Sequence, residues 1–192
     1  MTKLILATLA ASIVAIPAVA SAQALPAPVV AVVDVQRVTS QCNACKTALT
    51  QLETQVNGLR ALQTSLETPL RTEATSIQAA VTALAGRAPD AALQARATAF
   101  ERRQTDAQRQ LAAREQTFQR NREYVLQQIK TRLDPALTQV LARRNATIML
   151  DAANVLRSAP SVDVTADVIA ALNASLPSLS TTAPAQAAPT RR

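Results

Sequence analysis

Two cysteines, Cys42 and Cys45, stand three positions apart and are the only cysteines in the sequence. A C-x-x-C pair at a helix start is typical of thiol oxidoreductases, because the helix terminus lowers the pKa of the first thiol. The alternation of strands and helices found in thioredoxin-like proteins does not surround this pair. A zinc site would need two further ligands, which one chain lacks unless subunits share them. We favour a structural disulfide within the chain, while a bond between subunits, redox chemistry, a metal site and free thiols remain open.

Basic residues concentrate in one segment. Residues 87–132 hold ten Lys and Arg against five Asp and Glu, a local charge of +5, whereas residues 46–86 balance at three and three. All three aromatic residues of the chain lie in the same segment. A positive surface of this kind attracts acidic partners and anionic lipid headgroups over long range, and Arg stems can cover apolar surface. The alternative is an ordinary solvated helix face. The candidate binding residues are Arg87, Arg96, Phe100, Arg102, Arg103, Arg109, Arg114, Phe118, Arg120 and Arg122.

The composition excludes several function classes. The chain of 192 residues has no His, which excludes Ser-His-Asp and Cys-His catalysis and His-ligated metals. Its two glycines cannot form a phosphate-binding loop. Three aromatic residues cannot supply a base-stacking platform, so the net charge of +7 is a poor argument for nucleic-acid binding. We expect no enzyme activity, no cofactor and no nucleic-acid partner.

Residues 1–22 are typical of a cleaved secretory signal peptide. Lys3 supplies the positive region, an apolar run spans 4–14, and small residues lead to a cleavage site after Ala22. The apolar run is too short for a membrane span, which needs roughly 20 residues. The mature chain is therefore expected outside the cytoplasm, where cysteine pairs are usually oxidised.

The central part of the sequence predicts a helical hairpin. The β-branched run 29–35 predicts a strand, and Thr39 or Ser40 could then cap a helix. Apolar residues from Leu49 to Leu84 recur at spacings near 3.5, which indicates a coiled-coil seam. Segment 84–90 contains Gly86 and Pro89, which suit a helix end followed by a helix start. The second helix is predicted from about residue 89 to residue 144.

Some residues interrupt this pattern. Pro69 and Pro135 fall within the two predicted helices, where each should produce a kink. Gln104, Arg114 and Asn121 or Arg122 occupy seam positions where the repeat calls for apolar side chains. These polar residues either let the arms flex or are ordinary coiled-coil imperfections.

The C-terminal part predicts short elements and a tail. Residues 147–150 and 155–157 read as strands, and a helix follows with Thr165 as its cap. Residues 176–192 are rich in Pro, Ala, Thr and Ser, which predicts a disordered tail.

Together these elements predict a mainly α fold with a small β part (α+β). An arm formed by residues 39–144, with its tip near 85–90, projects from a body formed by residues 23–38 and 145–175. Three strands and one short helix are a very small core for one chain, so we expect an oligomer that combines the β parts. The expected oligomer-body residues are Val30, Val32, Val33, Val35, Ile148, Leu150 and Val155.

Two blocks of sequence resemble the Skp (OmpH) family of periplasmic chaperones. The first is the run Val30–Val38, and the second is Ile148–Leu156 followed by Val162–Asn173. The chain departs from the family where a Gly often precedes the second strand, because Asn145 stands there; Asn also tolerates positive φ. The cysteine pair, the tip sequence and the long tail match no family feature.

The resemblance implies a homotrimer whose three hairpins surround a cavity. It also implies an ATP-independent holdase that binds unfolded outer-membrane β-barrel proteins in the periplasm of a Gram-negative bacterium. Lipopolysaccharide or an anionic lipid surface is a further expected partner. The alternative hypothesis is a structural or adaptor hairpin protein of the cell envelope.

Overall fold

The computed structural model describes residues 26–185, so the predicted signal peptide lies outside the described residues. Its strands are β1 (Val30–Val33) and β2 (Ile148–Asp151). The α-helices are α1 (Val35–Gln41), α2 (Asn43–Ala83), α3 (Ala91–Arg143) and α4 (Thr165–Ser175). Two short 3-10 helices, η1 (Ala152–Asn154) and η2 (Pro160–Val162), lie between β2 and α4.

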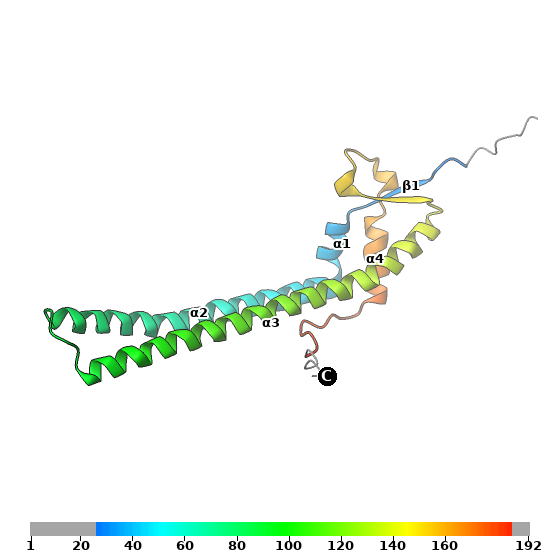
Figure 1. Cartoon of the computed structure of the whole chain (residues 1–192). Helices are drawn as coiled ribbons and strands as arrows, with labels where there is room; N and C mark the ends of the chain where they lie inside the picture. The colour runs from blue at the N-terminus through cyan, green and yellow to red at the C-terminus, as the bar shows by residue number, and fades with distance from the viewer. Residues whose placement is uncertain (1–25, 186–192) are drawn as a thin grey trace, which may run out of the picture.

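Helices α2 and α3 form one long antiparallel hairpin that projects from a small base (Figure 1). The base contains both strands, α1, α4 and the near ends of the two long helices. The predicted mainly α fold with a small β part is thereby confirmed. Pro69 and Pro135 both lie inside continuous helices. The kinks expected there remain predictions.

The sheet consists of two parallel strands. Val30 pairs with Ile148, and the register continues to Val33 opposite Asp151. On the other side of β1, Asp163 forms an isolated parallel bridge with Val32. The strand predicted at 155–157 is wrong. Asp151 accepts a hydrogen bond from the Ala153 N–H at 3.1 Å, and the chain turns into η1.

The prediction that the first helix starts at Thr39 or Ser40 is wrong. Asp34 caps α1 by accepting from the Arg37 N–H at 2.7 Å, so the helix begins at Val35. Val35, predicted in the strand, is therefore the first residue of α1. Thr39 and Ser40 lie inside α1, where their hydroxyls donate to backbone carbonyls three residues earlier. A second helix start follows at once, because Cys42 caps α2.

The tip closes through residues with positive φ. Ala85 and Gly86 have φ values of 50° and 89°, so the left-handed conformation begins at Ala85, one residue before the predicted glycine. Asp90 caps α3 by accepting from the Leu93 N–H at 2.8 Å. The helix consequently starts at Ala91, two residues later than predicted. At the other end of α3, Asn145 takes the positive φ, 51°, that its identity allows.

Residue Thr165 does not cap α4 as predicted. Thr165 is the first residue of the helix, and its N–H donates to Asp163 at 2.8 Å. Its hydroxyl accepts instead from the Asp34 N–H at 2.9 Å, which ties α4 to the end of β1. The buried side of α4 contains Val168 and Leu172, which are both fully buried.

The prediction of a disordered tail is wrong for residues 176–185. Leu176 is buried, and Leu179 packs against the apolar core. Residues 177–185, which we call the strap, then cross the hairpin near its base (Figure 1). Residues 186–192 lie outside the described part of the chain.

The apolar core lies at the base of the hairpin. All fully buried residues of α2 fall within its first ten positions, from Ala44 to Leu52. In α3 the buried residues are concentrated from Asn121 to Val140, and Ala107 is the exception. The distal part of the hairpin is therefore held by half-buried side chains.

Candidate functional site

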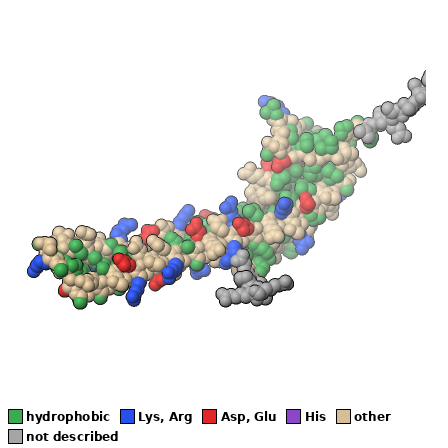
Figure 2. All heavy atoms as spheres, in the orientation of Figure 1, with side chains coloured by type: hydrophobic (Ala, Val, Ile, Leu, Met, Phe, Trp, Pro, Cys, Tyr) green, Lys and Arg blue, Asp and Glu red, His purple; other side chains and the backbone are tan. Residues whose placement is uncertain are grey.

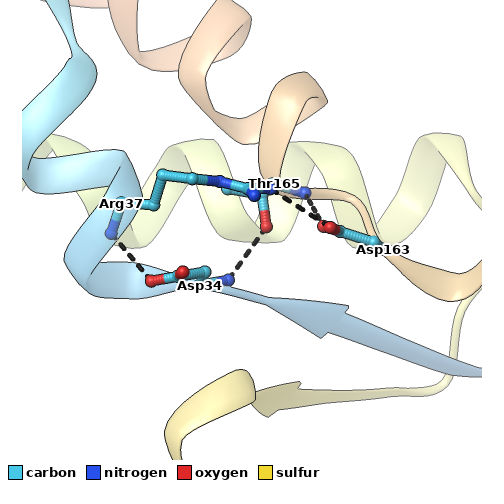
Figure 3. A network of polar contacts seen from close by, with 4 residues as sticks. All are labelled: Asp34, Arg37, Asp163 and Thr165. Carbon is cyan, nitrogen blue, oxygen red and sulfur yellow. Dashed lines mark hydrogen bonds and ion pairs between the residues drawn. The ribbon is translucent and has the colours of Figure 1, made fainter. Parts of the chain in front are cut away.

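A polar network at the base of the hairpin joins the β1–α1 junction to the start of α4 (Figure 3). The Arg37 guanidinium donates to Asp163 at 3.1 Å, while Asp163 also accepts from Thr165. Hydrogen bonds from the side chain and backbone of Thr165, and then the Arg37 charge, lower the pKa of Asp163. The network links two segments far apart in sequence, because Arg37 and Asp163 are separated by 126 residues.

The cysteine pair also lies at this root. Cys42 and Cys45 form a disulfide within the chain, and neither residue is exposed. The next residue after the Cys42 cap, Asn43, donates its N–H to the Asn173 side chain of α4 at 2.8 Å. The disulfide lies within the apolar core, which favours the structural interpretation of the pair. Within residues 26–185 there is no cluster of groups that could hold a metal ion.

An unburied apolar face remains on the sheet. Val30, Ile148 and Leu150 are about two-fifths exposed, at 37%, 42% and 43%. Strand β2 pairs only with β1 among the described residues, so its other edge is open. Figure 2 shows hydrophobic side chains gathered over the base. Exposed apolar faces and open strand edges of this kind are typical of surfaces that pair with another chain.

The expected oligomer-body residues divide into two groups. Val32 and Val33 are buried within the chain, and Val35 and Val155 are half-buried. Val30, Ile148 and Leu150 are the members that stay exposed. Leu156, which the sequence placed in a strand, is 98% exposed in the loop between the two 3-10 helices.

The basic residues of α3 extend along the hairpin, where Figure 2 shows Lys and Arg side chains projecting from it. Three of the predicted residues form ion pairs. Arg96 and Arg103 reach Glu73 of α2, at 2.7 and 3.5 Å, and Arg109 reaches Asp106 at 3.5 Å. Arg96 also donates to Ser76. The pair with Glu73 crosses between the two arms, so these residues fasten the distal hairpin.

The contact between Glu73 and Arg96 stabilises the charged form of both side chains. The Arg96 hydrogen bond, followed by the charges of Arg96 and Arg103, lowers the pKa of Glu73. The same hydrogen bond raises the pKa of Arg96. Sequence reasoning missed Glu73, because nothing in the sequence fixes the register that places it opposite Arg96.

The other predicted binding residues have varied surroundings. Arg87 donates to the Leu84 carbonyl at 3.1 Å and closes the tip, and Arg120 donates to the Thr117 hydroxyl at 3.2 Å. Phe100 is half-buried. Arg102 and Arg122 are exposed and form no ion pair within residues 26–185.

Arg114 and Phe118 line a hollow between the two arms. Its volume is about 440 Å³, and Leu59, Leu62 and Asn121 also line it. Gln104 lines a second hollow farther out, of about 320 Å³. The seam positions that the sequence marked as polar are thus where the arms separate enough to leave space.

Asn121 also lines the first hollow, but its side chain is buried and paired at both its nitrogen and its oxygen. It is only 7% exposed, and its side chain donates to the Gln55 side-chain oxygen at 2.9 Å. Its own oxygen accepts from the Ala183 N–H of the strap at 2.9 Å. A residue that looked like a defect in the seam is therefore the meeting point of α2, α3 and the strap.

These features define a class of protein: a helical hairpin arm rooted in a small parallel sheet that has an open apolar face. The family model for outer membrane protein (OmpH-like) matches residues 29–172, and the chain belongs to this family. The match spans both strands, the whole hairpin and most of α4.

Comparison with solved structures supports the fold. A chain from Caulobacter crescentus, described as a candidate outer membrane chaperone (OmpH-like), matches with a TM-score of 0.67 at 22% sequence identity. The match covers 82% of this chain and 90% of that chain. No curated protein matches the sequence. No helix within residues 26–185 is long and apolar enough to cross a membrane.

Proposed function

We propose that this protein is an ATP-independent holdase chaperone of the periplasm that keeps unfolded outer-membrane β-barrel proteins from aggregating. In this proposal it is a homotrimer. The open apolar sheet face forms the contact between subunits, and the three hairpins enclose the client. Lipopolysaccharide or an anionic lipid surface is a second proposed partner.

One observation carries this proposal. The hairpin presents basic and apolar side chains together along its length, in shallow open hollows and not in one enclosed pocket. Arg114 beside Phe118 and Leu59 is the clearest case. Many weak contacts of this mixed kind suit a flexible chain without a fixed shape, because charge gives attraction over distance and apolar surface gives adhesion. Membership of the OmpH-like family supports the same function.

Light scattering tests the holdase function. A urea-denatured outer-membrane β-barrel protein is diluted into buffer with and without the mature protein, at low and at high salt. We expect suppression of scattering that weakens with salt, because exposed charges are screened. Suppression unaffected by salt would support the chaperone function but reject a role for the basic surface in client binding. No suppression by folded, oligomeric protein would reject the holdase and favour the structural hairpin protein.

A pair of variants locates the charge that matters. The double substitution Arg102→Gln and Arg122→Gln removes two exposed charges that have no ion pair in the described structure, so it should raise the client's Kd and leave stability unchanged. Arg96→Gln with Arg103→Gln is the matched control, because it removes two charges that are already paired with Glu73. It should loosen the arms and affect client binding less. Equal effects of both variants on binding would contradict a role for the unpaired arginines.

A further inference from the structure

The strap lies on the hairpin through side-chain amides. The Gln128 side chain donates to the Ser180 carbonyl at 2.8 Å and accepts from the Ser180 N–H at 3.1 Å. Gln55 donates to the Thr181 carbonyl at 3.0 Å, and Asn121 accepts from the Ala183 N–H at 2.9 Å. The fifth hydrogen bond joins two side chains, because the Thr181 hydroxyl donates to the Gln51 side-chain oxygen at 2.8 Å. We call the residues Gln51, Gln55, Asn121 and Gln128 the amide row.

Four of these five hydrogen bonds go to main-chain atoms of the strap. A carboxamide offers both a donor and an acceptor, so it can pair with the N–H and the C=O of one residue, as Gln128 does with Ser180. Main-chain groups are the same in every sequence, except for the missing N–H of proline. The amide row therefore has the chemistry to hold any extended segment, which is how other peptide-binding surfaces gain affinity without sequence preference.

The amide row is built into the hairpin itself. Gln51 and Gln55 belong to α2, whereas Asn121 and Gln128 belong to α3. The Asn121–Gln55 hydrogen bond holds two of the four side chains in place across the seam. A buried amide is costly unless its groups are paired. The Asn121 side-chain oxygen accepts its hydrogen bond from the strap. The amide row therefore favours an occupant that has main-chain N–H groups.

The surface continues beyond the strap. The hollow of about 440 Å³ is lined by Thr182 of the strap and by Gln55 and Asn121 of the row. Its other walls include the apolar side chains of Leu59 and Phe118. An extended segment bound at the row could thus place apolar side chains in this hollow.

We propose that the amide row is a binding site for the main chain of an extended polypeptide, and that the strap is its resident ligand within the chain. The proposal rests on the holdase function and names how part of a client is held. An unfolded segment must displace the strap to reach the row. Client binding at this place is therefore competitive with the protein's own C-terminal segment.

The test changes the strap and leaves the row intact. In the full-length mature chain, Ser180→Pro with Ala183→Pro removes the two strap N–H groups that the row accepts. The probe is a fluorescein-labelled peptide with the sequence of residues 177–185, followed by fluorescence anisotropy. Loss of two hydrogen bonds should free the row and tighten probe binding by roughly tenfold. Adding Gln128→Leu to the double variant should reverse the gain, whereas Gln119→Leu, an exposed position of the same helix, should not.

Unchanged probe binding in the double proline variant would overturn the proposal, as would a gain that survives Gln128→Leu. Circular dichroism establishes that each variant keeps its helical content. Light scattering with the denatured β-barrel client is run on the same proteins. If scattering is suppressed but the probe behaves identically in all variants, the holdase stands and the amide row fails. If the probe responds as expected but no variant suppresses scattering, peptide binding by the amide row is supported and the holdase function is rejected.

Discussion

The root and the distal part of the hairpin are stabilised in different ways. At the root, α2 and α3 pack against α1, α4 and the sheet, and side chains such as Val38, Val140 and Leu172 are fully buried. Between Leu52 and Asn121, Ala107 is the only buried residue of the two described arms, and Glu73 with its two arginines links the arms. The root therefore supplies most of the stability, while the distal hairpin keeps its side chains available for contact and motion.

The largest effect is expected from the root core. Leu172→Ala should lower the free energy of unfolding by about 2–5 kcal/mol, because it leaves a cavity among fully buried side chains. Leu66→Ala, at a half-buried distal seam position, should cost only about 1 kcal/mol. Urea unfolding at one fixed protein concentration measures both, since assembly makes stability depend on concentration. Equal losses would remove the contrast between the two regions.

The disulfide between Cys42 and Cys45 is expected to add to the stability of the root. Replacing Cys42 and Cys45 with Ala should destabilise the protein by about 2 kcal/mol, because the unfolded chain loses a closed loop. The urea midpoint measures the loss, and mass spectrometry of the untreated protein should find the bond within one chain. A dimeric disulfide-linked species would contradict the intrachain assignment. An unchanged midpoint would show that the bond adds nothing to the root.

A smaller and local effect is expected from Glu73→Gln. Amide hydrogen exchange should become a few-fold faster in the distal arms and stay unchanged at the root, because the cross-arm ion pair is lost. The folded-state pKa of Glu73 is lowered, so its contribution is present above the unfolded pKa and is lost as pH falls through the folded value. Acidification should therefore reduce distal protection in the wild-type protein and not in the variant. Equal protection in both proteins at neutral pH would refute the contact's role.

The smallest effect concerns the pH dependence of the root network. Asp163 also has a lowered pKa, so the stability it adds is present above its unfolded pKa and disappears as pH falls through the folded value. Because the Arg37 and Asp163 side chains are about two-fifths exposed, at 42% and 40%, solvent screens much of this gain. The urea midpoints of wild type and Asp163→Asn should differ slightly at neutral pH and converge in acid. A constant difference across the range would assign the effect to something other than the carboxylate charge.

The hairpin could be predicted from the sequence because its evidence is local and periodic. Apolar spacing near 3.5 predicted the first arm, and Gly86 with Pro89 marked the tip and the start of the second arm. Helix starts were harder to place, since Asp34, Thr39 and Ser40 can all cap a helix. Only the structure shows that Asp34 receives the bond and that the two hydroxyls donate to helix carbonyls.

The candidate site was predictable in its charge but not in its pairing. Counting residues placed the excess of arginine on α3, yet the partner of Arg96 depends on the register between arms. The strap was missed for a different reason. Its composition predicts disorder, and it is held through main-chain atoms, which carry no trace in the amino-acid sequence. The residues that hold it, Gln55 and Gln128, are indistinguishable in the sequence from other surface glutamines.

The parallel pairing of β1 with β2 affects the order in which the chain folds. Just before β1, the Val29 N–H donates to the Thr147 hydroxyl, a partner 118 residues later in the sequence. Closing a loop of this length costs conformational entropy, whereas the contacts within each arm are local. Until the loop closes, a run of valines lies without its sheet neighbour, while the first arm can already form its helix. Folding is thus expected to end where the chain begins, with the N-terminal strand docking last against the finished return arm.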